Sequence, residues 1–380
     1  MIRCSTLSAL LVALWLAGCS EEPPPGETAG FAGLGQEAGD FSQAQEGIRL
    51  SFPEDHAAHP DYRIEWWYLT ANLEDERGEP LGLQWTLFRQ ALTSPDERPD
   101  SAPWAADQLW MAHMAVSQGE THRVAERFAR SHSGQDDGQA GAVAEPFRAW
   151  IDHWQLASRV EHDESDTFAE LTLTAHQDDE HGGFGYDLTL VAEGPLVLHG
   201  VAGFSQKSTD GQGSLYYSQP FWRVEGEATL DGETRVVSGR GWLDREWSSQ
   251  LLGPEQQGWD WFSLHLESGH KLMVFQLRGG GADGGDYRSG TWIDPEGEPT
   301  ALAPDEIAMT PLATQRVAGH EVPTRWRLEI PRAGLDMIVE APHAERWMDT
   351  SVSYWEGEVI AYDAESGENR GIGYLEMTGY

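Results

Sequence analysis

Short stretches of alternating apolar and polar residues recur along the chain and predict β-strands. Residues 64–73 read IEWWYLTANL, residues 81–90 read LGLQWTLFRQ and residues 186–194 read YDLTLVAEG. In a strand, successive side chains point to opposite faces, so Glu65 and Trp67 share one face while Trp66 and Tyr68 share the other. Helical periodicity is scarce, and glycine and aspartate separate the stretches as they do in hairpin turns. The pattern predicts an all-β protein.

The two halves of the strand pattern can be laid over each other. WWYLTANLEDERGEPLGLQWTLFRQ resembles WDWFSLHLESGHKLMVFQLRG, and GEATLDGETRVVSGRGWLD resembles GEVIAYDAESGENRGIGYLE, which places Asp244 opposite Glu376. We therefore expect two copies of one β-unit, at residues 47–250 and 251–380. Each copy is long enough for an antiparallel barrel that encloses a small apolar ligand, and a barrel also removes exposed strand edges. A single large β-sandwich is the alternative.

The N-terminus predicts export and lipid attachment. Arg3 precedes an apolar run that is too short to span a bilayer, and Leu-Ala-Gly-Cys ends at Cys19. Residues 1–18 are thus predicted to be a lipoprotein signal peptide, and Cys19 is predicted to carry the acyl chains that hold the protein on a membrane. The residue after Cys19 is serine rather than aspartate, which favours a periplasmic protein anchored to the outer membrane. Residues 19–46 are rich in proline, glycine and glutamate and predict a flexible tether that reaches about 30 Å.

Charge and cysteine content narrow the possible partners. The chain carries 63 acidic and 25 basic residues, for a formal net charge of −38, and its lysines are Lys207 and Lys271 alone. Such a surface repels phosphate, which excludes nucleic acid as a partner and leaves membrane attachment to the acyl anchor. Because Cys4 lies in the signal peptide, the mature chain is expected to have no disulfide.

Motifs for cofactors, metals and nucleophilic catalysis are missing from the sequence. His56 and His59 are spaced like a pair of metal ligands, but neither HExxH nor CxxC occurs. The glycine-rich segment 278–288 lacks the lysine and hydroxyl residues of a phosphate-binding loop and is expected to be a flexible loop. No GxSxG elbow is present. We therefore expect no cofactor and no metal.

Several long motifs resemble one known family. YRIEWWYLTANL, LWMAHMAVS, YYSQP and GRGWLDREWSSQ are similar to segments of the carotenoid 1,2-hydratase (hydroxyneurosporene synthase) and AttH-like family of lipocalin-like proteins. The resemblance runs from about Arg49 to Tyr380 and implies two tandem lipocalin-like antiparallel β-barrels. Some members are similar to proteins associated with ABC-type permeases of lipoprotein export, so such a permease is a possible partner.

The resemblance also implies candidate site residues. In the hydratases, the aspartate that corresponds to Asp244 is the proposed proton donor, and Trp242 and Tyr217 complete the candidate catalytic set. A tryptophan of the first strand, Trp66 or Trp67, is expected to pack on Arg245 at a closed end of the barrel, with Glu65 neutralising the arginine. The complete set of ligand-binding or barrel-closing candidates is Glu65, Trp66, Trp67, Tyr68, His113, Arg245, Glu246 and Trp247.

Two functions from different classes follow. The first is binding of a hydrophobic lipid or isoprenoid-like molecule by a lipid-anchored periplasmic protein, and the alternative is hydration of a terminal isoprenoid double bond. A structural role in a complex is the third possibility. Trp242 stands where the hydratases have tyrosine, and SLYYSQP lacks their histidine. Binding is therefore ranked first, with Asp244 expected to pair with an arginine.

Overall fold

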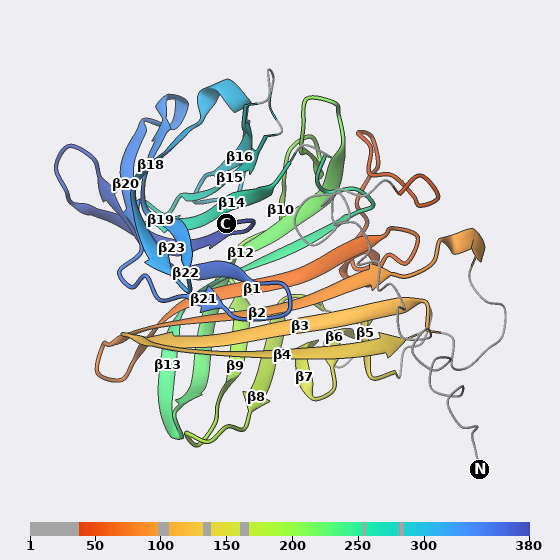
Figure 1. Cartoon of the computed structure of the whole chain (residues 1–380), viewed down its shortest axis with the longest axis horizontal. Helices are drawn as coiled ribbons and strands as arrows, with labels where there is room; N and C mark the ends of the chain where they lie inside the picture. The colour runs from red at the N-terminus through yellow and green to blue at the C-terminus, as the bar shows by residue number, and fades with distance from the viewer. Residues whose placement is uncertain are drawn as a thin grey trace, which may run out of the picture.

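The protein is described by a computed structural model, shown in Figure 1. The described residues are 38–97, 106–131, 138–159, 167–253, 256–279, 281 and 285–380. The predicted signal peptide, Cys19, residues 19–37 of the predicted tether, and residues 280 and 282–284 of the glycine-rich segment lie outside them. In the described part of the chain, no helix combines the length and apolar character needed to cross a membrane.

The described strands form two antiparallel sheets, of 13 and 10 strands. The first sheet contains β1 (Ile64–Asp75), β2 (Pro80–Ala91), β3 (Gln108–Gln118), β4 (Thr121–Ser131), β5 (Ala140–Ala144), β6 (Phe147–Ile151), β7 (Trp154–Ser158), β8 (Glu170–Gln177), β9 (Phe184–Ala192), β10 (Val197–Leu198), β11 (Phe204–Gln206), β12 (Gly213–Leu230) and β13 (Glu233–Ser248). The second contains β14 (Gly258–Leu266), β15 (Lys271–Arg278), β16 (Tyr287–Ile293), β17 (Pro299–Leu302), β18 (Ala308–Val317), β19 (His320–Ile330), β20 (Leu335–Glu340), β21 (Trp347–Met348), β22 (Tyr354–Asp363) and β23 (Asn369–Met377). Short 3₁₀ turns occur at Glu54–His56, Pro95–Glu97, Pro304–Glu306 and Pro331–Ala333. The all-β class, predicted from alternation, is confirmed, and so is the tandem arrangement of two antiparallel units, predicted from the duplication and the family resemblance.

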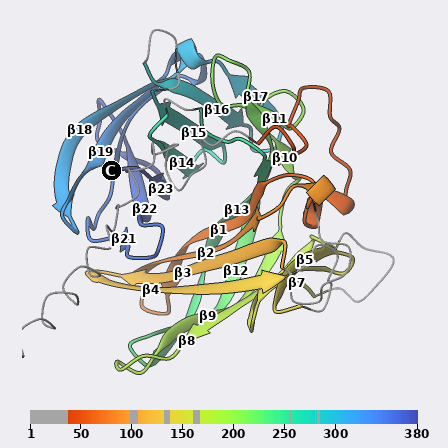
Figure 2. The same cartoon turned by 45° about the vertical axis from the view of Figure 1, so that its right-hand side comes forward.

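The first sheet curves into a nearly closed barrel. Its strand order is β4-β3-β2-β1-β13-β12-β9-β8-β7-β6-β5, and the two terminal strands, β4 and β5, lie close to each other. The second sheet has the order β17-β16-β15-β14-β23-β22-β20-β19-β18. Both sheets are strongly curved in the two views of Figures 1 and 2. The change of sheet falls between Ser248 and Gly258.

The internal duplication predicted from the sequence appears in the strand registers. β1 lies between β2 and β13 in the first sheet, as β14 lies between β15 and β23 in the second. The residues overlaid in the two copies also have equivalent partners across the strands. The corresponding pairs are Leu69–Leu243 and Phe262–Leu375, Ala71–Gly241 and Leu264–Gly373, and Leu73–Gly239 and Leu266–Gly371.

Residues 38–46, which belong to the predicted tether, contact the first barrel. Ala38 is buried, and the backbone N–H of Ser42 donates to the carbonyl of Asp61 at 3.0 Å. The hydroxyl of Ser249, just after β13, donates to the carbonyl of Ser42. This part of the chain is therefore held against the end of the first sheet.

Each sheet has its own apolar core, and a third cluster joins the two sheets. Trp67 and Leu69 belong to the core of the first sheet, and Phe262 belongs to that of the second. The third cluster lies between the sheets and consists of aromatic and aliphatic side chains from both. Its aromatic members are Tyr68, Tyr216, Trp242, Trp261, Phe275, Tyr287 and Tyr374.

Candidate functional site

Strand β1 buries both of its faces, each against a different environment. Trp67 lies in the core of the first barrel and Glu65 points to the same side, whereas Tyr68 belongs to the cluster between the sheets and Trp66 packs against that cluster. This is the arrangement that the period of two predicts for a strand. The consecutive aromatic residues Trp66, Trp67 and Tyr68 are therefore explained by burial of both faces of β1.

The carboxylate of Glu65 lies in an ion cluster inside the first barrel. Arg89 Nε contacts its Oε1 and Arg245 Nη2 contacts its Oε2, with all three side chains almost fully buried. Burial alone would raise the pKa of Glu65, but the charges of Arg89 and Arg245 outweigh it and hold that pKa well below its usual range. Arg245 Cζ lies 3.9 Å from the ring centroid of Trp67. The predicted cation–π pair is therefore confirmed for Trp67 and not for Trp66.

Trp247 belongs to the same cluster. Its ring stacks on the imidazole of His59 with 4.0 Å between the centroids, and Arg245 Cζ lies 4.9 Å from it. The backbone N–H of His59 donates to Glu65 Oε1 at 2.9 Å. Stacked rings thus lie around a buried carboxylate whose charge is compensated by two arginines.

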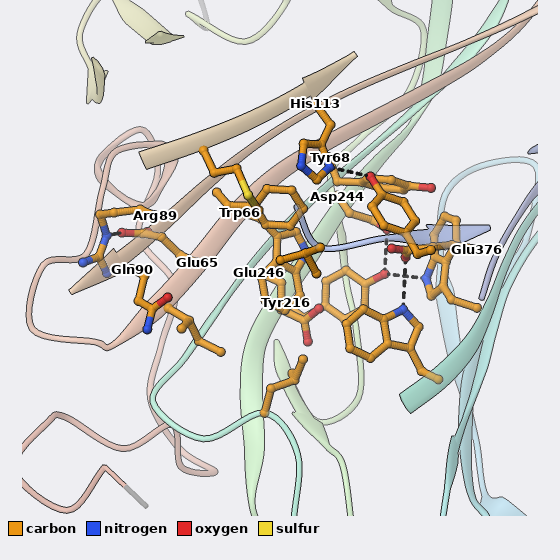
Figure 3. Close-up of a pocket in the computed structure, with 18 of the residues that line it drawn as sticks. Glu65, Trp66, Tyr68, Arg89, Gln90, His113, Tyr216, Asp244, Glu246 and Glu376 are labelled. Carbon is orange, nitrogen blue, oxygen red and sulfur yellow. Dashed lines mark hydrogen bonds and ion pairs between the residues drawn. The ribbon is translucent and has the colours of Figure 1, made fainter. Parts of the chain in front are cut away.

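A cavity of about 240 Å³ lies between the two sheets. Figure 3 shows its walls, which come from β1, β2 and β3 of the first sheet and from β14, β15 and β23 of the second, among other strands. Its lining is mainly aromatic and aliphatic. The aromatic residues that line it are Trp66, Tyr68, Phe88, Phe128, Tyr216, Trp259, Trp261, Phe275 and Tyr354. The acidic residues that line it are Glu65, Asp244, Glu246 and Glu376.

Asp244 lines this cavity and pairs with no arginine among the described residues. Trp242 Nε1 donates to its Oδ1 at 2.7 Å, the Ser218 hydroxyl donates to the same oxygen, and the Tyr216 hydroxyl donates to Oδ2 at 2.8 Å. The expected pairing of Asp244 with an arginine is therefore wrong. Side chains of neighbouring residues in a strand point to opposite faces, so Arg245 enters the first barrel while Asp244 points between the sheets.

Burial controls the charge of Asp244. Desolvation raises its pKa to about 7, in spite of the three hydrogen-bond donors that favour the carboxylate. A large share of Asp244 is therefore neutral near neutral pH. An acid that is neutral at pH 7 in an apolar site is able to donate a proton there.

The partners of Asp244 determine which oxygen holds the proton. Oδ1 faces the indole N–H of Trp242, and an indole N–H can only donate. Oδ2 faces the hydroxyl of Tyr216, which can accept, and that hydroxyl already receives Trp261 Nε1–H at 3.1 Å. We infer that, when Asp244 is neutral, its proton is on Oδ2 and the Tyr216 hydroxyl accepts this hydrogen bond, whereas it donates to Oδ2 when Asp244 is ionised.

A buried chain of hydrogen bonds through Ser218 and His199 determines the hydrogen bond that Asp244 Oδ1 accepts. Ser218 Oγ lies 2.6 Å from His199 Nε2, and His199 Nδ1 lies 2.8 Å from Thr291 Oγ1 of the second sheet. Burial lowers the pKa of His199 to about 3, so the imidazole is neutral and bridges the two hydroxyls as one donor and one acceptor. With His199 Nε2–H donating to Ser218, the serine hydroxyl is directed at Asp244 Oδ1.

The structure separates Tyr217 from the other two predicted catalytic residues. Tyr217 Oη lies 2.6 Å from His56 Nδ1, and its ring packs with Trp247 in a cluster that does not line the cavity. Its neighbour Tyr216, rather than Tyr217, lies beside Asp244. The reason is again the period of two along β12, which turns adjacent tyrosines to opposite faces.

The remaining sequence candidates lie at the cavity wall. His113 lines the cavity, with Nδ1 2.9 Å from Tyr354 Oη and Nε2 3.1 Å from Glu126 Oε1. Glu246 also lines it, and its Oε1 is paired with Lys207 Nζ at 2.7 Å. Lys207 therefore compensates the negative charge of Glu246, whereas Asp244 has no cationic partner among the described residues.

Sequence reasoning missed four residues of this site. Tyr216, Ser218 and His199 surround Asp244, and Glu376 lines the same cavity from the second sheet. The one available signal was the duplication, which already aligned Glu376 with Asp244. No local pattern marks His199, because it reaches the site only when the segment after β10 packs on β12.

Metal ligation is not supported in the part of the chain that the structure describes. No group of three or more histidine, cysteine, aspartate or glutamate side chains there has the arrangement of a metal site. His56 stacks on Phe168 at 3.9 Å between centroids, and His59 Nε2 contacts Asp55 Oδ1 at 3.1 Å. The two histidines thus make packing and ion-pair contacts with side chains of the first unit.

Comparison with known proteins agrees with the strand pattern. The sequence profile of the AttH-like family matches residues 43–380. The chain belongs to the AttH-like family. This AttH-like chain is similar to the crystal structure of a protein described as AttH from Nitrosomonas europaea, with 33% identity and a TM-score of 0.76 over 90% of this chain and 99% of that one.

Two other solved structures share the AttH-like fold. Kievitone hydratase from Nectria haematococca has a TM-score of 0.59 and 16% identity, with 90% of this chain and 98% of that chain covered. CghA with Sch210972 has a TM-score of 0.52 and 13% identity, with 89% and 94% covered. At these identities the likeness shows the fold alone. A search of proteins with curated functions found no significant match to the sequence.

Proposed function

We propose that this protein binds an apolar, isoprenoid-like molecule in the cavity between its two sheets and adds water to a terminal double bond. The observation that carries the proposal is Asp244, a carboxyl with a pKa of about 7 in a cavity lined mainly by aromatic residues. Binding without chemistry ranks first on the sequence alone, because Trp242 replaces the tyrosine of the hydratases and SLYYSQP lacks their histidine. Hydration now ranks first, because Asp244 pairs with no arginine among the described residues and its pKa is raised to about 7 by burial.

The proposed chemistry needs an acid, a surface for a cation and a water molecule. Neutral Asp244 gives its Oδ2 proton to one carbon of the alkene, directly or through the hydroxyl of Tyr216. The other carbon becomes a tertiary carbocation, which the faces of Trp66 and Trp261 stabilise electrostatically. A lone pair of water forms the C–O bond to this cation, and loss of one proton from that water to a base or to solvent gives a tertiary alcohol. The hydratase named among the solved structures is a further reason to test this reaction.

The test compares wild type with Asp244→Asn. An acyclic carotene and the short isoprenoid 2,6-dimethyloct-2-ene are incubated with each protein, and the alcohols are measured by mass spectrometry. Because the amide keeps the size and polarity of the acid but cannot deliver its proton, we expect hydration to fall by about 10²–10⁴-fold with retention of a hydrophobic fluorescent probe unchanged. Wild type that retains the probe but hydrates neither alkene would refute the proposal.

Binding without chemistry is the second candidate, favoured by the apolar lining of the cavity. In that case the protein would hold a lipid or isoprenoid for transfer, as a periplasmic lipoprotein anchored through Cys19 and working with an ABC-type permease. The anchor, the location and the permease stay predictions. Lipid extracted from the purified protein, together with unchanged binding in Asp244→Asn and no turnover in wild type, would support this candidate.

A further inference from the structure

The duplication places a second carboxyl in the same cavity as Asp244. Asp244 pairs across the strands with Tyr68 of β1, and Glu376 pairs in the same way with Trp261 of β14. These are equivalent positions in the two copies, and all four side chains line the cavity. Asp244 of the first sheet and Glu376 of the second therefore line the cavity from the same place in each repeat, and Figure 3 labels both.

The two carboxyls differ in their hydrogen bonds. Both oxygens of Asp244 have partners in the protein, including the indole N–H of Trp242. Glu376 Oε2 accepts the indole N–H of Trp259 at 3.1 Å, whereas its Oε1 has no hydrogen-bond partner among the described residues. Glu376 is only partly buried and lines the cavity, and its Oε1 is accessible to solvent. A carboxylate oxygen in this position is able to accept a hydrogen bond from water.

The charges of the two acids are linked. Burial raises the pKa of Glu376 to about 7, the value also reached by Asp244, and the negative charges of Asp244 and Glu246 contribute to this rise. Two carboxyls with similar pKa values that repel each other favour the state in which they share one proton. Near neutral pH, one of them is then an acid while the other is a base.

We propose that Glu376 is the base that takes a proton from the water molecule during hydration, with its Oε1 as the accepting atom. This role rests on the hydratase function proposed above. Asp244 transfers its proton to one alkene carbon, where the π electrons form the new C–H bond. A lone pair of water forms the C–O bond to the cation, and one proton of that water moves to Glu376. Asp244 ends as the carboxylate and Glu376 as the acid, and transfer of one proton between them, through solvent, restores the starting state.

The reverse reaction separates the two roles. When the product alcohol ionises, Glu376 donates a proton to the leaving hydroxyl group, and return of water to the cation reverses that step. Oxygen exchange between the alcohol and water therefore needs Glu376 alone, whereas formation of the alkene also needs Asp244 to remove a carbon-bound proton. The two acids thus affect two different measurable products.

The experiment incubates 2,6-dimethyloctan-2-ol with each protein in H₂¹⁸O and measures both ¹⁸O in the alcohol and the alkene formed. We expect wild type to give both products and Asp244→Asn to give exchange without alkene. Glu376→Gln should lose exchange by about 10²–10⁴-fold. Glu340→Gln serves as the matched control and should behave as wild type, because the Glu340 side chain is exposed, contacts Arg325 and does not line the cavity. Glu376→Ala in added formate should regain exchange, because formate fits the space of the missing carboxyl, and no purely structural role predicts this.

Three outcomes would overturn the role of Glu376. The first is that Glu376→Gln exchanges oxygen at the wild-type rate. The second is that Asp244→Asn and Glu376→Gln lose exchange and alkene formation equally while their melting temperatures are unchanged. The third is that formate restores no exchange to a folded Glu376→Ala. Wild type that gives neither exchange nor alkene would instead refute the hydratase function itself, and the role of Glu376 with it.

Discussion

Replacing Glu65 by glutamine is expected to destabilise the protein strongly. The substitution removes the only carboxylate that contacts both Arg89 and Arg245 among the described residues, and both guanidinium groups are almost fully buried. Breaking a buried ion pair by removing one partner costs about 3–5 kcal/mol, because the remaining charge stays buried without compensation. Arg89 Nη2 keeps its bonds to the carbonyls of His59 and Tyr62, at 2.9 and 2.6 Å, so we expect a loss within this range rather than above it.

Equilibrium unfolding in urea at pH 7, followed by tryptophan fluorescence, measures the loss. The matched control is Asp336→Asn, because Asp336 is bonded to Arg327 at 2.7 Å but the two side chains are 48% and 42% exposed. An exposed pair contributes about 0–1 kcal/mol, so the control should unfold almost as wild type. A loss below about 1 kcal/mol for Glu65→Gln would refute our account of the ion cluster.

The same variant has a defined pH dependence. The pKa of Glu65 is lowered in the folded state from an ordinary value of 4.5. The unfolded state therefore binds more protons in acid, and the stability that Glu65 contributes is present above about pH 4.5 and is lost as pH falls towards the folded pKa. The difference in unfolding free energy between wild type and Glu65→Gln should shrink on acidification below pH 4.5, and a constant difference would contradict this assignment.

Three further predictions follow from the same contacts. Glu356→Gln should destabilise the protein less than Glu65→Gln in the same urea assay, because burial raises the pKa of Glu356 well above its usual range, and the amide oxygen can still accept from the Tyr68 hydroxyl, which lies 2.5 Å away. A loss like that of Glu65→Gln would contradict this difference between the two carboxyls. Tyr217→Phe should leave hydration of 2,6-dimethyloct-2-ene unchanged, since Tyr217 faces His56 and not the cavity, and a loss of more than tenfold would contradict the assignment to Tyr216. Cys19→Ser should move the protein from the membrane to the soluble fraction on cell fractionation, and membrane retention would contradict the predicted anchor.

Alternation and duplication were enough to predict most of the fold. The period of two placed Glu65 and Trp67 on one face of a strand, and both enter the first barrel as expected. The overlay of the two copies matched the registers of the strands that surround β1 and β14. These features are set by neighbours along the chain or by closely similar segments, and a single sequence contains that information.

The contents of the cavity could not be predicted in the same way. Both tyrosines of YYSQP are buried, Tyr216 between the sheets and Tyr217 against the first barrel. The pattern of apolar and polar residues therefore could not predict which tyrosine contacts Asp244. Trp261 completes the site from the second sheet, and its contact depends on how the two sheets pack. The charge state of Asp244 likewise depends on desolvation by residues of both sheets, which no sequence motif records.

The central claim is that Asp244 is a neutral acid in an apolar cavity, and infrared difference spectroscopy tests it most directly. Spectra of wild type and Asp244→Asn, recorded between pH 4 and pH 9, isolate the carbonyl band of the protonated Asp244 carboxyl. Because burial raises the pKa of Asp244 to about 7, the wild-type band should be present at pH 5 and should disappear with a midpoint near pH 7. The Asp244→Asn variant should lack the band at every pH. A wild-type spectrum without that band at pH 5 would show that Asp244 is ionised in the folded protein and would contradict its role as the proton donor.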